Sequence, residues 1–140
     1  MNGNYLLLMA GKGSRFSSLS SDLPKPLLKI GNKRMFEVAS DSIIKNFVNV
    51  KKIYLCCNQE VIKNLSKTKK IFRKINVVKS NSPIQTVLKT TKYSNFNKSL
   101  PMVIFDCDQN FDLYNKINLN NIFNEQINSF IFFKKTKSKN

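Results

Sequence analysis

Short apolar runs alternate along this chain with segments in which apolar residues recur at helical spacing. The apolar runs, which predict strands, cover residues 5–10, 53–57, 75–79, 101–107 and 128–133. The intervening segments, which predict helices, cover residues 33–47, 59–72, 83–93 and 113–126. Alternation at this spacing implies right-handed crossovers between parallel strands. We therefore expect a Rossmann-like α/β fold with three layers (α/β/α) and a mostly parallel sheet.

The length of 140 residues allows one domain with a single core. We expect residues 1–133 to form this domain and residues 134–140 to form a basic tail. Because the layout stops about two-thirds of the way through a typical α/β arrangement, we expect the fold to be truncated. The last strand, with the sequence Phe-Ile-Phe-Phe at residues 130–133, would form a hazardous edge. We expect another element, a second subunit or a partner to cover it.

The net charge of +16 comes mainly from lysines that are scattered along the chain. Proteins that bind nucleic acid usually concentrate basic residues on one face, often with aromatic residues between them. We therefore expect a solvated lysine surface and no specific nucleic-acid partner. No apolar run approaches the ~18–20 residues of a membrane span, and we expect a cytoplasmic protein without membrane contact.

Two residue types limit the chemistry of the chain. The sequence contains no histidine, which excludes histidine-based catalysis and zinc sites with histidine ligands. The three cysteines, Cys56, Cys57 and Cys107, lie in apolar runs, and we expect them to be buried structural thiols.

The first apolar run ends at Gly11-Lys12-Gly13-Ser14-Arg15, and Pro24-Lys25-Pro26 follows shortly after. Glycines let backbone N–H groups approach phosphate oxygens, while Arg15 and Lys25 supply positive charge, so this segment is well suited to hold a triphosphate. It is not a dinucleotide fingerprint, because Phe16 stands where the third glycine belongs. It is not a Walker A loop either, because a glycine follows Lys12.

An acidic pair follows the fourth predicted strand. Asp106 and Asp108 are two residues apart, so on an extended strand their side chains point the same way at its carboxyl end. If the first and fourth strands are neighbours, these carboxylates face the 11–15 loop, where they would be Mg²⁺ ligands beside a triphosphate. The alternative is that they cap the next helix, a role that Asp112 fits better as the N-cap of the helix predicted from residue 113.

The segment from Gly11 to Phe16, together with Pro24-Lys25-Pro26, resembles the signature of the nucleotidyltransferase superfamily, which includes the sugar-phosphate nucleotidylyltransferases (NDP-sugar pyrophosphorylases). The similarity extends through Leu27, Leu28 and Ile30 to Met35. The sequence Phe-Asp-Cys-Asp-Gln at residues 105–109 is similar to the strand-end motif whose aspartate binds the metal. That aspartate corresponds to Asp108, and Asp106 stands where relatives often have asparagine. The resemblance covers the N-terminal, nucleotide-binding half of such an enzyme.

The resemblance implies transfer of a nucleoside monophosphate from a nucleoside triphosphate to a phosphorylated small molecule, above all a sugar 1-phosphate, with release of pyrophosphate. It implies Mg²⁺ as cofactor, held by Asp108. Arg15 would hold the leaving phosphates and Lys25 would neutralise the α-phosphate. The implied nucleotide-binding residues are Met9, Ala10, Gly11, Gly13, Ser14 and Gln85. Ser82 and Pro83 replace a glycine that relatives carry near the base, which leaves base binding by Gln85 open.

In this family the acceptor site and a second acidic metal ligand come from the later half. We therefore expect the chain by itself to bind nucleotide weakly and to turn over poorly. One alternative is a non-catalytic nucleotide-binding half-domain that a partner chain completes. The other is a basic module that binds nucleic acid, although charge alone gives no reason for Asp106 and Asp108.

Overall fold

The computed structural model describes residues 3–11, 23–65, 68–77, 80–93 and 96–122. Within these residues the strands are β1 (Asn4–Met9), β2 (Lys29–Ile30), β3 (Lys33–Arg34), β4 (Ile53–Cys57), β5 (Phe72–Asn76) and β6 (Met102–Asp106). The helices are the 3-10 helix η2 (Lys25–Leu27), α1 (Met35–Asn46), α2 (Gln59–Asn64), α3 (Pro83–Thr90) and α4 (Leu119–Ile122).

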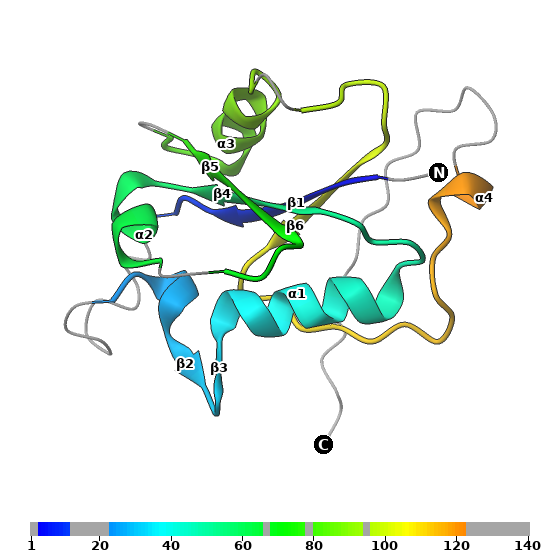
Figure 1. The fold of residues 1–140 in the computed structure, drawn as a ribbon, viewed down its shortest axis with the longest axis horizontal. Helices are drawn as coiled ribbons and strands as arrows, with labels where there is room; N and C mark the ends of the chain where they lie inside the picture. Colours follow the sequence, from blue (N-terminus) through cyan, green and yellow to red (C-terminus); the bar gives the residue numbers. More distant parts are fainter. Residues whose placement is uncertain (1–2, 12–22, 66–67, 78–79, 94–95, 123–140) are drawn as a thin grey trace.

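The main sheet has the strand order β5-β4-β1-β6, and all of its neighbouring strands are parallel. Helix α1 covers one face of the sheet and α3 the other (Figure 1). This arrangement confirms the expected Rossmann-like α/β fold with three layers. The chain leaves β1 toward β4 and β5 and then returns to the other side of β1 with β6, so the strand order reverses between β1 and β6. Ligands of such sheets bind at the carboxyl ends of the strands beside this reversal.

Strand β1 lies at the centre of the sheet, and its side chains alternate between two apolar clusters. Tyr5, Leu7 and Met9 belong to the cluster under α1, which also contains Phe36 and Ile43. Leu6 and Ala10 belong to the cluster on the other face, where Val87 of α3 packs. Because both faces of β1 are covered, the strand is a continuous apolar run rather than an alternating one.

Residues 24–34, which directly precede α1, form a platform. Prolines 24 and 26 flank Lys25, and Pro26 and Leu27 are buried, with Leu27 in the core under α1. Strands β2 and β3 then form a small hairpin whose turn begins at Gly31 with φ of +60°. A residue with positive φ at the first central position of a two-residue turn is what a type II′ hairpin requires, and glycine adopts it at little cost. Helix α1 follows directly, and the Glu37 carboxylate accepts the Arg34 N–H at 2.8 Å.

Two predicted boundaries were wrong around residue 70. Helix α2 ends at Asn64 instead of continuing to residue 72, and β5 begins at Phe72 instead of residue 75. Phe72 and Ile75 are three residues apart, as in a helix, but on β5 they face opposite sides of the sheet and enter different clusters. Residues 72–76 form a strand because pairing with β4, in the register Ile53↔Phe72, satisfies their backbone groups. Smaller shifts occur at α1, which begins at Met35 rather than residue 33 because Lys33 and Arg34 pair with β2.

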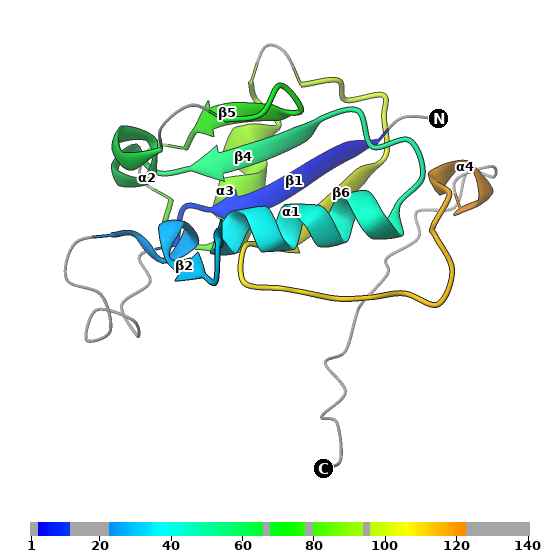
Figure 2. The same cartoon turned by 60° about the horizontal axis from the view of Figure 1, so that its bottom comes forward.

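The prediction of a helix from residue 113 was also wrong over residues 113–118. The chain after β6 runs extended along α1, and the only helical turn it reaches among the described residues is α4 (Figure 2). Asp112 is not a helix cap but forms an ion pair with Lys45 at 2.5 Å. The strand predicted at residues 128–133 and the tail at 134–140 lie outside the described residues.

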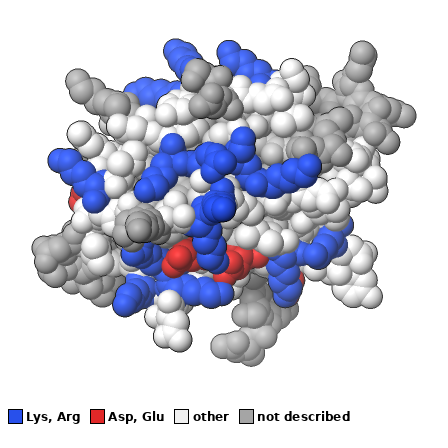
Figure 3. Space-filling model, in the orientation of Figure 1, with Lys and Arg blue, Asp and Glu red and all other residues white. Residues whose placement is uncertain are grey.

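The side chains of the described residues agree with two further expectations. The thiols of Cys56, Cys57 and Cys107 are all free and buried. On the face seen in Figure 3, lysines and arginines cover much of the surface and a few acidic side chains lie among them.

No helix in the described part of the chain is long and apolar enough to cross a membrane.

Candidate nucleotide site

The carboxyl ends of β1 and β6 lie side by side, which is the condition under which the acidic pair can lie near the 11–15 loop. The register pairs Leu8 of β1 with Asp106 of β6, so the acidic turn after β6 lies beside the residues that lead into Gly11. Strand β6 ends at Asp106, and Asp108 lies in the following turn, in which the Gln109 N–H donates to the Asp106 carbonyl at 3.3 Å. The direction of the Asp108 side chain is therefore set by a turn and not by strand alternation.

Lys25 and Asp108 are in direct contact, although 83 residues separate them in the sequence. The Lys25 ammonium nitrogen Nζ lies 2.5 Å from Oδ2 of Asp108. The Lys25 side chain is 17% exposed and the Asp108 side chain 41%. The platform of η2 holds the lysine and the turn after β6 holds the aspartate. The structure therefore brings together the two residues to which the sequence assigned phosphate and metal binding.

Asp106 shares the electrostatic environment of this pair. Partial burial raises the pKa of the Asp106 carboxyl above its ordinary value, and the negative charge of Asp108 raises it further, while the Lys25 ammonium opposes the shift. Two carboxylates and one ammonium thus act on one another at the carboxyl end of β6.

The carboxylates of Asp106 and Asp108 provide some, but not all, of the ligands of a Mg²⁺ site. Mg²⁺ prefers oxygen ligands and is usually bound through one or two carboxylates together with phosphates and water. No group of three potential ligands among Asp, Glu, Cys and His occurs within the part of the chain that the structure describes. Asp106 and Asp108 therefore fit a metal that the protein shares with phosphate oxygens, and they do not form a complete protein cage.

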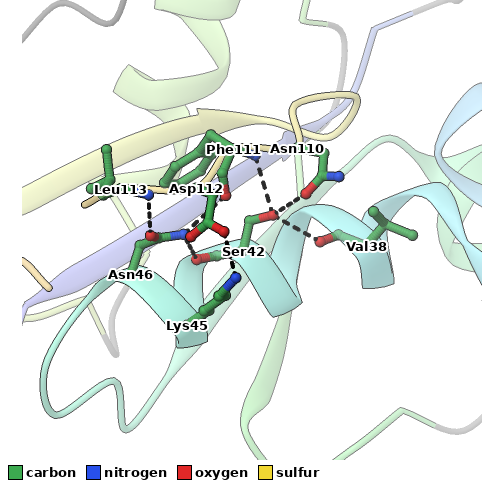
Figure 4. A network of polar contacts seen from close by, with 8 residues as sticks. All are labelled: Val38, Ser42, Lys45, Asn46, Asn110, Phe111, Asp112 and Leu113. Carbon is green, nitrogen blue, oxygen red and sulfur yellow. Dashed lines mark hydrogen bonds and ion pairs between the residues drawn. The ribbon is translucent and has the colours of Figure 1, made fainter. Parts of the chain in front are cut away.

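A strap of four residues, Asn110–Leu113, fixes the chain just beyond Asp108 to the side of α1 (Figure 4). The Ser42 hydroxyl lies 2.6 Å from Oδ1 of Asn110, and Asn46 donates from Nδ2 to the Phe111 carbonyl at 3.0 Å. The Leu113 N–H donates to Oδ1 of Asn46 at 2.7 Å. The side chains of Ser42 and Asn46 are buried, so these bonds are protected from competition by water.

The strap also has an apolar anchor. The ring of Phe111 stacks on that of Phe105, with centroids 5.5 Å apart and planes only 4° from parallel. Phe105 itself is buried in the cluster under α1. The turn that carries Asp108 is therefore held on both sides, by β6 before it and by the strap after it.

A groove of about 490 Å³ opens beside the strap, and its charged side chains are paired with one another. Lys33 contacts Asp41 at 2.6 Å, and Lys45 contacts Asp112 at 2.5 Å. This pairing leaves the described side chains of the groove without an excess of either charge.

The other predicted nucleotide-binding residues differ in what they can offer. The side chains of Met9 and Ala10 are buried on opposite faces of the sheet, and the Ala10 carbonyl accepts from Nδ2 of Asn58 at 3.3 Å. Gly11 is exposed. Gln85 is exposed in the first turn of α3, where its Oε1 accepts the Asn81 N–H at 3.0 Å and the Ser82 side chain caps the helix.

The remaining three predicted residues, Gly13, Ser14 and Arg15, lie outside the described residues. Ser82 and Pro83, which stand in place of the expected glycine, are the N-cap and first residue of α3. They are well matched to starting a helix, because serine caps the free N–H groups and proline has none to lose at this position.

Comparison with known families agrees with this geometry. The family model for nucleotidyl transferases matches residues 4–136. The chain belongs to the nucleotidyl transferase family. The reaction class that this family supports is nucleotidyl transfer from a nucleoside triphosphate. No curated protein matches the sequence significantly.

Two residues that hold the strap, Ser42 and Asn46, were missed by sequence reasoning. Their signal was available, since two polar residues one helical turn apart stand beside the apolar positions of α1. Their partners could not be found in this way, because Asn110 and Phe111 are 68 and 65 residues distant in the sequence.

Proposed function

We propose that this chain provides the nucleotide site of an enzyme that transfers a nucleoside monophosphate from a nucleoside triphosphate to a sugar 1-phosphate. The observation that carries the proposal is the 2.5 Å contact of Lys25 with Asp108 at the carboxyl ends of β1 and β6. A cationic side chain and a carboxylate at this place are the two kinds of group that a triphosphate and its divalent cation need.

The chemistry of the proposed reaction needs positioning and charge neutralisation. A phosphate oxygen of the acceptor forms a new bond to the α-phosphorus of the nucleotide, and the bond from this phosphorus to the bridging oxygen breaks. The electron pair leaves with pyrophosphate, whose anionic oxygens need no proton from a general acid. A site without histidine is therefore adequate for this step.

Each side chain has a defined part in this proposal. Lys25 neutralises negative charge that grows on the α-phosphate, and Arg15 holds the leaving phosphates. Asp108, assisted by Asp106, holds Mg²⁺, which supplies further positive charge to the phosphate oxygens when bound. The burial of Pro26 and Leu27 keeps the Lys25 backbone in place, and the contact with Asp108 orients its ammonium.

Backbone groups and one amide would bind the rest of the nucleotide. Gly11, Gly13 and Ser14 offer N–H groups to the phosphates, and glycine allows their close approach. Met9 and Ala10 contribute only backbone groups, since their side chains are buried. Gln85 bonds an edge of the base. The acceptor class rests on the resemblance of the sequence to the sugar-phosphate enzymes, and the cytoplasmic location on the lack of an apolar run of membrane-spanning length.

The proposal is tested by measuring the binding of nucleoside triphosphates with Mg²⁺ by calorimetry, followed by pyrophosphate release with a panel of sugar 1-phosphates. We expect Lys25→Ala and Asp108→Ala to abolish pyrophosphate release and to weaken nucleotide binding by about 10-fold or more, because each removes a charged contact. Lys33→Ala and Asp41→Ala are matched controls, since each removes the same charge from an ion pair of similar length at α1. Nucleotide binding and turnover at the wild-type level in either Lys25→Ala or Asp108→Ala would contradict the assignment.

A further inference from the structure

We propose that Lys25 competes with the divalent cation for Asp108 and thereby couples metal binding to nucleotide binding. The inference rests on the proposed function, because it takes the two residues as parts of one nucleotide and metal site. It goes further by giving Lys25 a second role, in which it disfavours metal binding until phosphate groups accept its ammonium.

The geometry of the ion pair creates the competition. Oδ2 of Asp108 already accepts from the Lys25 ammonium at 2.5 Å. A divalent cation on this carboxylate would lie within a few ångströms of the ammonium, and like charges at such a distance repel strongly when they are partly shielded from water. Asp108 therefore cannot serve both cations fully at once.

The backbone of Lys25 does not allow the ammonium to move far away. Pro26 and Leu27 are buried beside it, and the Lys25 side chain itself is only 17% exposed. The Leu27 N–H also closes the turn on the Pro24 carbonyl at 2.8 Å. The ammonium therefore remains within reach of Asp108 unless another anion at the same place accepts it.

Removal of the lysine charge should strengthen metal binding. Lys25→Met takes away the ammonium that contacts Asp108 at 2.5 Å, and Asp106, two residues earlier at the end of β6, adds a second carboxylate to this edge of the sheet. Carboxylates attract a divalent cation more strongly when a neighbouring ammonium is removed.

Nucleotide phosphates change this balance because they offer Lys25 other oxygens. Once the ammonium donates to the α-phosphate, it no longer competes with the metal for Oδ2 of Asp108. By thermodynamic linkage, nucleotide then raises metal affinity and metal raises nucleotide affinity by the same factor. Lys25 thus makes the site select the metal–nucleotide complex over the free metal.

The test is a titration of the protein with Mn²⁺ or Mg²⁺ alone, by calorimetry, in wild type, Lys25→Met and Lys33→Met. We expect Lys25→Met to bind the metal at least about 5-fold more tightly than wild type, which is the lower range of coupling between linked sites. Lys33→Met is the matched control, because it removes one lysine charge from a 2.6 Å ion pair with Asp41 and should change metal affinity by less than about 2-fold. In the double variant Lys25→Met/Asp108→Asn, the gain in metal affinity should disappear.

A second titration, in the presence of a non-hydrolysable nucleoside triphosphate analogue, measures the coupling directly. Nucleotide should raise metal affinity in wild type and in Lys33→Met, and much less in Lys25→Met. Metal affinity in Lys25→Met that equals or falls below that of wild type overturns the competition. The proposed function fails separately, if wild type and Lys33→Met do not bind nucleotide with Mg²⁺ or if Lys25→Met and Asp108→Asn bind it as well as wild type.

Discussion

The side-chain amide of Asn46 donates to the carbonyl of Phe111 at 3.0 Å and so joins the end of α1 to the segment that follows Asp108. Asn46 also donates to the Ser42 carbonyl at 2.8 Å and accepts the Leu113 N–H at 2.7 Å. The residue is 2% exposed, so water cannot replace these bonds. A single buried amide therefore connects the core helix to the turn that carries the proposed metal ligand.

We expect Asn46→Ala to lower the free energy of unfolding by about 2–3 kcal/mol, because it leaves buried backbone groups without a partner. Urea denaturation followed by circular dichroism measures this loss. Asn64→Ala is the control, since Asn64 is exposed and makes one bond, to the Glu60 carbonyl at 3.0 Å. Its effect should stay within about 0.5 kcal/mol. Equal effects of the two substitutions would show that the strap does not stabilise the fold.

Gly11 and Gly31 should respond in opposite ways to substitution by alanine. At Gly11 an added Cβ would meet no atom of the described residues within 4 Å, so we expect Gly11→Ala to change stability by less than about 0.5 kcal/mol. It should nevertheless weaken nucleotide binding, because the new methyl group would hinder the approach of phosphate to the backbone. Thermal unfolding and calorimetric titration with nucleotide measure the two effects, and unchanged nucleotide affinity would remove Gly11 from the site.

Gly31→Ala should lower the stability of the fold and leave nucleotide binding nearly unchanged. The backbone of Gly31 has φ of +60°, and a Cβ there costs about 1 kcal/mol. The hairpin of β2 and β3 precedes α1 directly, so we expect reduced stability of the folded chain. The affinity for nucleotide, measured under conditions in which the variant is folded, should stay close to that of wild type. A variant as stable as wild type would contradict the conformation assigned to this turn.

Gln85→Ala tests base recognition separately from phosphate binding. The Oε1 atom of Gln85 accepts from the Asn81 backbone, which fixes the amide at the start of α3. Removing the amide should reduce the difference in affinity among the four nucleoside triphosphates and leave the dependence on Mg²⁺ unchanged. Competition titrations with the four nucleotides measure this. If the order and spread of affinities are the same as in wild type, the base is recognised elsewhere.

The buried thiols predict a loss of stability at alkaline pH. Burial raises the pKa of Cys56 to about 11 and those of Cys57 and Cys107 to about 12, from an ordinary value of 9.0. Below pH 9 the thiols keep their protons in both states and contribute no pH dependence. Above pH 9 the unfolded chain loses these protons while the folded chain retains them, so the free energy of unfolding falls until about pH 11–12.

This loss should amount to about 1 kcal/mol for each thiol between pH 8 and pH 10. Urea denaturation at the two pH values, in the presence of a reductant, measures it. The variant Cys57→Ala should show a smaller decrease than wild type over the same interval. An identical decrease would mean that the Cys57 thiol ionises equally easily in both states. Reaction with a thiol reagent at pH 8 should likewise require unfolding.

Sequence reasoning succeeded where chemistry and local pattern coincide. Lys25 between two prolines and Asp108 after a buried strand each carry a strong local signal, and the structure brings the two into contact. Both residues could be singled out because each signal depends on a single short segment. The sequence left open whether the first and fourth strands are neighbours, and the structure pairs β1 with β6 in parallel.

The errors occurred where a distant segment competes for the same residues. Phe72 and Ile75 have helical spacing, but pairing with β4 makes them part of a strand. Residues 113–118 have apolar spacing suited to a helix, but the Leu113 N–H donates to Oδ1 of Asn46 at 2.7 Å and the Ile117 N–H donates to the Asn46 carbonyl at 2.7 Å. Local propensity differs by only tenths of a kcal/mol per residue, so a few long-range hydrogen bonds outweigh it.

The sequence by itself determined the class of fold and the kinds of groups that meet at the nucleotide site, because apolar periodicity and charged motifs are local properties of the chain. Only the tertiary structure decided that the Lys25 ammonium and the Asp108 carboxylate touch, at 2.5 Å. That contact requires the η2 platform, the register of β6 beside β1, and the strap on α1 to be in place together. The physical reason is that a distance between residues 83 positions apart depends on packing of the whole core, which no single segment encodes.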